Sequence, residues 1–397
     1  SFHRMAEQRA VDSAERGWAA WELRPEGQSP AGIASILYHW FGAHPLVMLP
    51  LNALVFAVAT AAARSLLTTL TGSRGAATLG ILPFLLFPSF LMVWGQIHKD
   101  VFSGAGLLIV LASLAAAAKG RGNLLGIAAA MTAGGTLIWI ARAYALEIAT
   151  GASLIFTLSI ALLRPRTAWR PALAVLALIA TTAVLTTVGS GIGKGMLRGA
   201  ASVSQSALPQ TAPDSQQPPT PAELCLPAPS GNPIDSVLFS ICRERQHFLH
   251  WHPEAGSNMD ADAELRTLTE FLAYLPRAAQ IATLLPSPLA TAERTSEIGR
   301  IGQLSVTFEM AVAYLAFALA VIFARGRLLE PPVLATILFA LSYILVHVYA
   351  LPNLGTLHRM RIFMFTALVG LGVSLAVTAF LARRDEARPD AADSRKV

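Results

Sequence analysis

Long apolar runs alternate with short polar segments along most of the chain. A helix of about 20 apolar residues is long enough to cross the ~30 Å hydrocarbon core of a bilayer. Nine runs approach that length, and the pattern therefore predicts an all-α polytopic membrane protein with about nine or ten transmembrane helices. The runs cover residues 45–66, 76–96, 101–118, 124–141, 145–163, 172–192, 305–323, 333–349 and 362–381. Pro83 and Pro88 fall inside the second run and are expected to kink it.

Two larger polar regions divide this pattern. Residues 1–42 are predicted to be a first loop outside the cytoplasm, with an interfacial helix around Trp18, Trp21 and Glu22, which recur at helical spacing. Residues 195–302 are predicted to be a large loop on the same side, irregular between 209 and 229. Its amphipathic stretch 264–277 and the short apolar stretch 278–289 are expected to be interfacial or re-entrant helices. Residues 43–194 then hold helices one to six, 303–382 helices seven to nine, and 383–397 a cytoplasmic tail.

Composition and charge support a membrane location and orient the helices. Apolar residues make up 54% of the chain and charged residues 14%, which excludes a soluble globular domain. Basic residues cluster in loops at alternate ends of consecutive runs, so the formal charge of +6 reflects topology and not nucleic-acid binding. The basic side is the cytoplasm by the positive-inside rule. The excess of arginine over lysine and the abundant alanine suggest a GC-rich bacterium, so we expect the chain in a bacterial inner membrane. Because nine spans with an outside start leave the carboxyl end inside, and Ser1 stands where a start methionine would, a preceding helix is expected.

The two cysteines, Cys225 and Cys242, both fall in the large loop assigned to the outer face. An oxidising compartment permits a disulfide there, and we predict that these two residues form one. The nearby histidines His247, His250 and His252 could bind a metal, but a solvated loop is the favoured interpretation.

Unusual polar residues gather on the predicted outer face. Charges at membrane depth are costly and mark pathways or sites, and arginine donates paired hydrogen bonds that suit phosphate. These residues predict a site for a lipid-linked phosphate or diphosphate. The alternative is an ordinary charged turn with arginines that reach the interface by snorkelling. The candidate substrate-binding residues are His98, Lys99, Arg142, Tyr144, His358, Arg359 and Arg361.

Carboxylates supply the other half of the predicted chemistry. Sugar transfer from a polyprenyl phosphate needs a base for the acceptor hydroxyl and cations for the leaving phosphate. Asp12 and Asp100 are the candidate catalytic residues, as base or ligand of a divalent cation, the one cofactor considered. Glu147 is expected to pair with Arg142, and Glu309 to form a hydrogen bond inside the bundle.

Several short motifs together resemble the membrane glycosyltransferases of the GT-C superfamily, and equally the related exopolysaccharide and O-antigen polymerases. They are Asp12 in an outer amino-terminal segment, Leu51-Asn52-Ala53, Pro88 ahead of Lys99-Asp100, Arg142-Ala143-Tyr144, and the stretch from Asn353 to Arg359 and Arg361. The resemblance implies an extracytoplasmic active site and a polyprenyl-linked sugar donor, with Asp12 corresponding to the first-loop acid of the family.

The leading hypothesis is therefore a glycosyltransferase or glycan polymerase of cell-surface polysaccharide or glycolipid assembly. Its expected partners are a polyprenyl-phosphate-linked sugar, a glycan or lipid acceptor and membrane lipids, without nucleic acid. Two alternatives stay open. A transporter or flippase of lipid-linked glycan would use the same cations as a headgroup path, and broken helices with inverted repeats would favour it. A non-catalytic subunit of a polysaccharide-synthesis complex is favoured if Asp12 and Asp100 lie far apart.

Overall fold

The computed structural model describes residues 2–206, 232–251, 257–285 and 297–386, together with residues 225, 253 and 255. Within these ranges the protein is helical, with one isolated antiparallel bridge between Asn258 and Asn353. Eight helices are long and apolar enough to span a membrane, and a bent helix pair makes up to nine. The prediction of an all-α multi-pass membrane protein is confirmed. The eight are α3 (Leu49–Thr71), α7 (Asp100–Ala118), α8 (Leu124–Ala141), α9 (Ala143–Leu163), α10 (Trp169–Ser206), α13 (Glu297–Leu328), α14 (Pro331–Ala350) and α15 (Leu354–Glu386).

The second predicted run is broken, as its prolines suggest. It forms α4 (Arg74–Gly80), α5 (Leu82–Leu86) and α6 (Pro88–Trp94), with a bend of 69° between the first two helices and the last. Pro83 and Pro88 stand at the starts of α5 and α6, where the missing N–H of proline leaves no helical hydrogen bond unmade. The kink prediction is confirmed.

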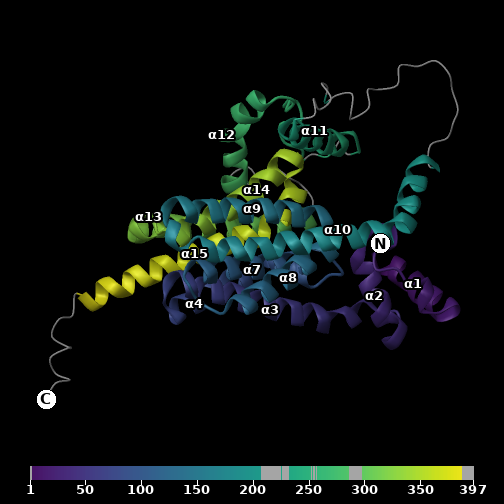
Figure 1. Ribbon diagram of the computed structural model, residues 1–397, viewed down its shortest axis with the longest axis horizontal. Helices are drawn as coiled ribbons and strands as arrows, with labels where there is room; N and C mark the ends of the chain where they lie inside the picture. Colours follow the sequence, from purple (N-terminus) through teal and green to yellow (C-terminus); the bar gives the residue numbers. More distant parts are fainter. Residues whose placement is uncertain are drawn as a thin grey trace.

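Two helices form the centre of the bundle. In the spanning window of α7, 89% of the residues are buried, and in that of α15, 78%. The corresponding fraction is 28–33% for α3, α8, α9, α10 and α13, which therefore surround the central pair and turn most of their surface outward. In Figure 1 these helices run side by side, with α11 (Pro233–Trp251) and α12 (Leu268–Leu284) along one flank near α14.

A close approach of α7 and α8 sets the register at the end of the bundle that carries the site. A Cβ atom added to Gly106 of α7 would lie 2.4 Å from the carbonyl oxygen of Gly134 of α8. The two antiparallel helices can therefore touch through their backbones only because both positions are glycine. Six residues before Gly106 is Asp100, and eight residues after Gly134 is Arg142. The same contact thus brings Asp100 and Arg142 to one level.

The amino-terminal region differs from the prediction. The first helix, α1, spans Phe2–Arg16 and ends at Gly17, which has a φ of 79°. Trp18–Ala20 is a short 3-10 helix, so the prediction of an amphipathic helix around Trp18, Trp21 and Glu22 is wrong. A second helix, α2 (Ser29–Phe41), packs against α1 through alanines and Tyr38. Arg24 and Ser29 donate hydrogen bonds to the carbonyls of Trp139 and Ile140, which lie in the last turn of α8 and lack helical partners. These contacts fix the segment beside the site.

The large polar region is more helical than expected. The helix α10 continues to Ser206 and α15 begins at Leu354, so both extend beyond the predicted runs. Two helices are expected over 264–277 and 278–289, but one helix, α12, runs through Leu268–Leu284 of these stretches. It begins with a capping box of Thr267 and Glu270 and passes through Pro276, and residues 286–289 lie outside the described residues. The predicted irregular stretch 209–229, apart from Cys225, and the tail after Glu386 lie outside the described residues. The predicted disulfide between Cys225 and Cys242 is present, with 5.9 Å between the Cα atoms.

A short backbone clip joins this region to the start of α15. The N–H of Met259 donates to the carbonyl of Pro352 (2.7 Å), and the N–H of Leu354 donates to the carbonyl of Ser257 (2.9 Å). Asn353 also donates from its side chain to the hydroxyl of Ser257 (2.6 Å). The clip therefore anchors the amino-terminal turns of α15, which carry several of the candidate residues.

Candidate functional site

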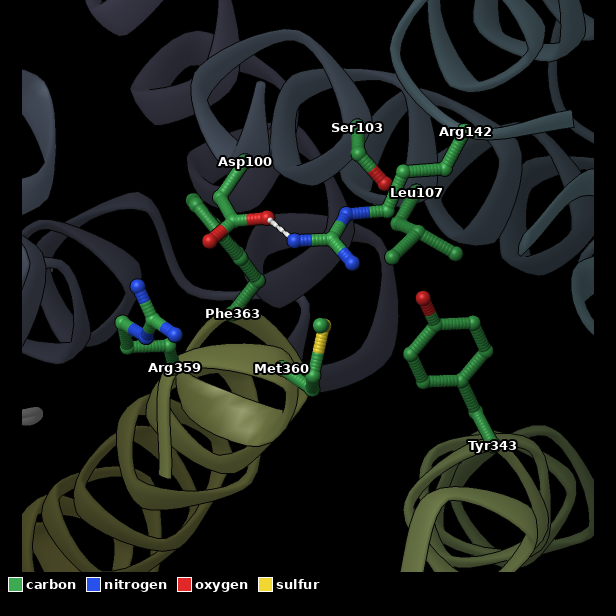
Figure 2. A pocket seen from close by; sticks show the side chains of 8 residues that line it. All are labelled: Asp100, Ser103, Leu107, Arg142, Tyr343, Arg359, Met360 and Phe363. Atoms are coloured by element: carbon green, nitrogen blue, oxygen red, sulfur yellow. Dashed lines mark hydrogen bonds and ion pairs between the residues drawn. The ribbon is translucent and has the colours of Figure 1, made fainter. Parts of the chain in front are cut away.

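An ion pair between Asp100 and Arg142 lies at the centre of the candidate site. Asp100 is the first residue of α7, where a carboxylate faces the positive end of the helix dipole. Arg142 joins α8 to α9 in extended conformation and directs its side chain toward Asp100 (Figure 2). The Arg142 Nη2 and Asp100 Oδ1 atoms are 2.5 Å apart, and the two side chains are only 7% and 4% exposed. A buried charge pair of this kind at the end of a membrane bundle is costly to desolvate, which makes it a candidate functional site.

His98 binds the second oxygen of the same carboxylate. Its Nδ1 atom is 2.9 Å from Asp100 Oδ2, and its other nitrogen, Nε2, faces Arg359 Nη1 at 3.5 Å. The ring of Phe2 from α1 meets the imidazole edge-on, with 6.0 Å between the ring centroids. His98 is therefore held between α1, α7 and α15.

Two further cations, Lys99 and Arg359, and the phenol of Tyr144 complete the cluster. Arg142 Nη1 donates to the hydroxyl of Tyr144 at 2.5 Å. Lys99 is half-buried, and burial together with the nearby Arg142 lowers the pKa of its ammonium below the ordinary value, although Asp100 opposes the shift. Arg359, on α15, is exposed and lies on the Asp100 side of the cleft in Figure 2. The cluster has one carboxylate, that of Asp100, and three basic side chains, those of Arg142, Lys99 and Arg359. Its net positive charge therefore favours the binding of an anion.

A small cleft opens beside the pair. It encloses about 210 Å³ of empty space, its open mouth included, and Tyr343 of α14 points its hydroxyl toward Arg142 from the far wall (Figure 2). Sequence reasoning did not select Ser103, Tyr343 or Met360, because each stands within or beside an apolar run and carries no charge. Their alignment with Arg142 depends on how α7, α14 and α15 pack. The lining residues are Asp100, Ser103, Leu107, Arg142, Tyr343, Arg359, Met360 and Phe363.

Asp12 belongs to a different part of the structure. It lies on α1, ten residues after Phe2, which corresponds to about 15 Å along the helix from the residue that touches His98. Its described side-chain partners are Gln8 and Arg9 of the same helix. The structure therefore brings Asp100, and not Asp12, into the cationic cluster. This separation is the outcome that favours a non-catalytic subunit, so a transferase would have to depend on Asp100 and its neighbours and not on a pair of carboxylates.

His358 and Arg361 point away from the cleft to two separate buried positions. His358 Nε2 is 3.7 Å from Glu309 Oε2, while Glu309 Oε1 accepts a hydrogen bond of 2.7 Å from the backbone N–H of Ser89 in α6. The hydrogen bond expected for Glu309 inside the bundle is confirmed. Arg361 is fully buried and donates to the carbonyls of Ile281 (2.8 Å), Ala282 (2.9 Å) and Leu285 at the end of α12.

These contacts give Arg361 a structural role. The last carbonyls of a helix lack internal partners, and a cation placed on them also offsets the helix dipole. Arg361 therefore caps α12 and is not available to a ligand. Arg359, predicted to lie in a loop before the last span, instead lies within the second turn of α15, which turns it toward His98.

The remaining candidates do not join the cluster. Glu147 is exposed on α9, and Arg142 pairs with Asp100 instead. The loop predicted for the histidines is wrong for two of them, because His247 and His250 lie on α11, where His247 accepts a hydrogen bond of 2.9 Å from Trp251. His252 lies outside the described residues. Within the part of the chain that the structure describes, no three His, Cys, Asp or Glu side chains come together as metal ligands.

The geometry can bind an anion and hold an imidazole ready for proton transfer. Arg142 and Arg359 offer N–H donors to the cleft, Lys99 adds positive charge nearby, and Asp100 contacts both Arg142 and His98. Comparison of the chain with protein-family models, with curated proteins and with solved structures finds no match in any of the three. The argument for function therefore depends on the site alone.

Proposed function

We propose that this protein is a membrane glycosyltransferase or glycan polymerase that takes sugar from a polyprenyl-(di)phosphate-linked donor at the extracytoplasmic face. The observation that carries the proposal is the buried Asp100–Arg142 pair at the centre of a cationic cleft, at the end of a multi-span bundle. Lys99, Arg142 and Arg359 bind the phosphate of the donor. The acceptor is a glycan or lipid in cell-surface polysaccharide or glycolipid assembly.

The position of the cleft suits a lipid-linked substrate. Asp100 and Arg142 stand at the ends of apolar helices, so a phosphate bound to them lies at headgroup depth while its polyprenyl chain stays in the hydrocarbon. Asn52, in the motif that resembles the family, donates to the carbonyls of Trp94 and Gln96 (both 2.9 Å) and so holds the segment that leads to His98. The cleft is small and open at its mouth, so we place only the phosphate of the donor against Arg142 and Arg359, and the rest of the donor outside it.

Binding of decaprenyl monophosphate to the full chain in lipid nanodiscs tests the phosphate site. Because Arg359 is exposed, Arg359→Gln is expected to leave the fold intact and to weaken binding about tenfold or more, the loss of a charge-assisted hydrogen bond of about 1.5–3 kcal/mol. The matched control is Arg243→Gln on α11, whose side chain is 52% exposed and pairs with its exposed neighbour Glu244. If decaprenol without phosphate binds equally well, or if both variants behave alike, the site is not a phosphate site.

A flippase of lipid-linked glycan is the second candidate. The observation that favours it is the break of 69° between α4–α5 and α6, because discontinuous spans are common at transporter binding sites. Reconstituted protein separates the two functions. A flippase moves a lipid-linked sugar across a vesicle membrane with its glycosidic bond intact, whereas a transferase releases polyprenyl phosphate.

A further inference from the structure

We propose that His98 is the general base of this site and that Asp100 is the residue that positions it. This inference rests on the proposed transferase function and names the group that takes the proton of the acceptor hydroxyl. A carboxylate bound by arginine is a poor base because the cation stabilises its ionised form. Asp100 binds Arg142 through one oxygen and His98 through the other, so the reactive group is the imidazole beyond it.

The two neighbours of His98 specify one neutral tautomer. An ionised carboxylate can only accept a hydrogen bond, so the Nδ1 atom 2.9 Å from Asp100 Oδ2 carries the ring proton. A guanidinium can only donate, so the Nε2 atom that faces Arg359 carries the lone pair. The backbone N–H of Asp100 also points at Nδ1, at 3.3 Å, and would donate to it in the other tautomer. The contact of Nδ1 with the carboxylate is shorter, at 2.9 Å, and is to a charged acceptor, so we assign the ring proton to Nδ1.

Nε2 is placed where a substrate can reach it. The His98 side chain is 13% exposed, and Arg359, its neighbour at 3.5 Å, is itself exposed, so an acceptor hydroxyl can displace that weak contact. The groups that face the imidazole are Asp100, Arg359 and the uncharged ring of Phe2, with Lys99 adjacent in the chain. Displaced from Nε2, Arg359 remains beside the cleft and can bind the donor phosphate.

The chemical step balances with these groups. The acceptor hydroxyl gives its proton to His98 Nε2 while its oxygen forms a bond to the anomeric carbon of the sugar. The bond between that carbon and the phosphate oxygen breaks, and the phosphate leaves with the electron pair beside Lys99, Arg142 and Arg359. The imidazolium, stabilised by Asp100, then releases its proton to water.

Nitrogen NMR of the full chain in nanodiscs, labelled with ¹⁵N-histidine, tests the tautomer without any substrate. The resonances of His98 are assigned by their loss in His98→Gln. We expect a protonated Nδ1 and an unprotonated Nε2. In Asp100→Asn, Arg142 can only donate and therefore holds the amide oxygen, which turns the amide NH₂ toward His98 and forces the proton onto Nε2. A protonated Nε2 in the wild type, or an unchanged tautomer in Asp100→Asn, would overturn the proposal.

Transfer activity completes the test, with isolated membranes of the source organism as the supply of lipid-linked sugar and acceptor. We expect His98→Gln to lower the turnover about 100-fold or more, the usual contribution of a general base. Binding of decaprenyl monophosphate should stay within about threefold of wild type, because the cations are intact. A His98→Gln protein with wild-type turnover refutes the role of His98. A wild-type protein that neither binds the phosphate nor transfers sugar refutes the proposed function instead, whatever the tautomer.

Discussion

The buried pair of Asp100 and Arg142 gives a quantitative test of how the site is built. Asp100→Asn and Arg142→Gln each leave one charge without its partner at a position that is 4–7% exposed. Removing one member of a buried pair costs about 3–5 kcal/mol. We expect about 3 kcal/mol for each variant, because His98 still contacts Asp100 and Tyr144 still contacts Arg142. The double variant should cost clearly less than the sum of the two, since neither charge is then left alone.

The measurement is a double-mutant cycle on the free energy of unfolding, in detergent micelles or by steric trapping in bilayers. We expect a coupling energy of about 2–3 kcal/mol between Asp100 and Arg142. The matched control is the ion pair of Glu264 and Arg266, whose side chains are 64% and 38% exposed, with a coupling below about 1 kcal/mol. A coupling of Asp100 with Arg142 no larger than the control would refute the view that they act as one buried unit.

Three further predictions concern the elements around the site. Gly106→Val should lower the free energy of unfolding by at least about 1–3 kcal/mol, because the valine side chain would overlap the backbone of α8. The control is Gly151→Ala on α9, where the space is open, and this variant should be neutral or stabilising by up to about 1 kcal/mol. Arg361→Ala should abolish the hydrogen-exchange protection of the last turn of α12; unchanged protection would contradict the capping role. The hydrogen bond from Arg277 lowers the pKa of Asp260, so the stability that Asp260 contributes is fully present above the ordinary value of 3.8 and is lost as the pH falls through the lower folded value. Hydrogen exchange around residues 257–262 measures this: protection should fall as the pH is lowered in the wild type, and Asp260→Asn should abolish that pH dependence. An identical pH profile in the variant would be evidence against it.

The sequence by itself determined the class of fold and most of its spans. Nine apolar runs are expected to become helices in a bilayer because hydrocarbon offers no partner to the backbone N–H and C=O groups. Among the residues that the structure describes, eight helices are long and apolar enough to span, and the bent pair accounts for the ninth run. The bend at Pro83 and Pro88 also follows from local chemistry, since proline cannot continue a hydrogen-bonded helix. The pairing of Cys225 with Cys242 follows from there being only two cysteines in the chain.

Only the tertiary structure decided which polar residues share a site. The sequence shows Arg359 and Arg361 two positions apart, but successive positions on a helix point in different directions, 100° apart per residue, so these two side chains diverge. Arg359 turns toward His98, while Arg361 turns inward and caps α12. Asp12 and Asp100 were equivalent candidates in the sequence, and the direction of α1 separates them.

The same reason explains the residues that the sequence did not reveal. Tyr343 stands in an apolar run 240 residues after Ser103 along the chain, and yet both line one cleft. Periodicity reports which face of a helix is apolar, but not which helix packs against that face. Which helices pack together is determined by the contact of Gly106 with Gly134, the clip at Asn353 and the packing of α14. These contacts depend on shape complementarity between segments far apart in the chain.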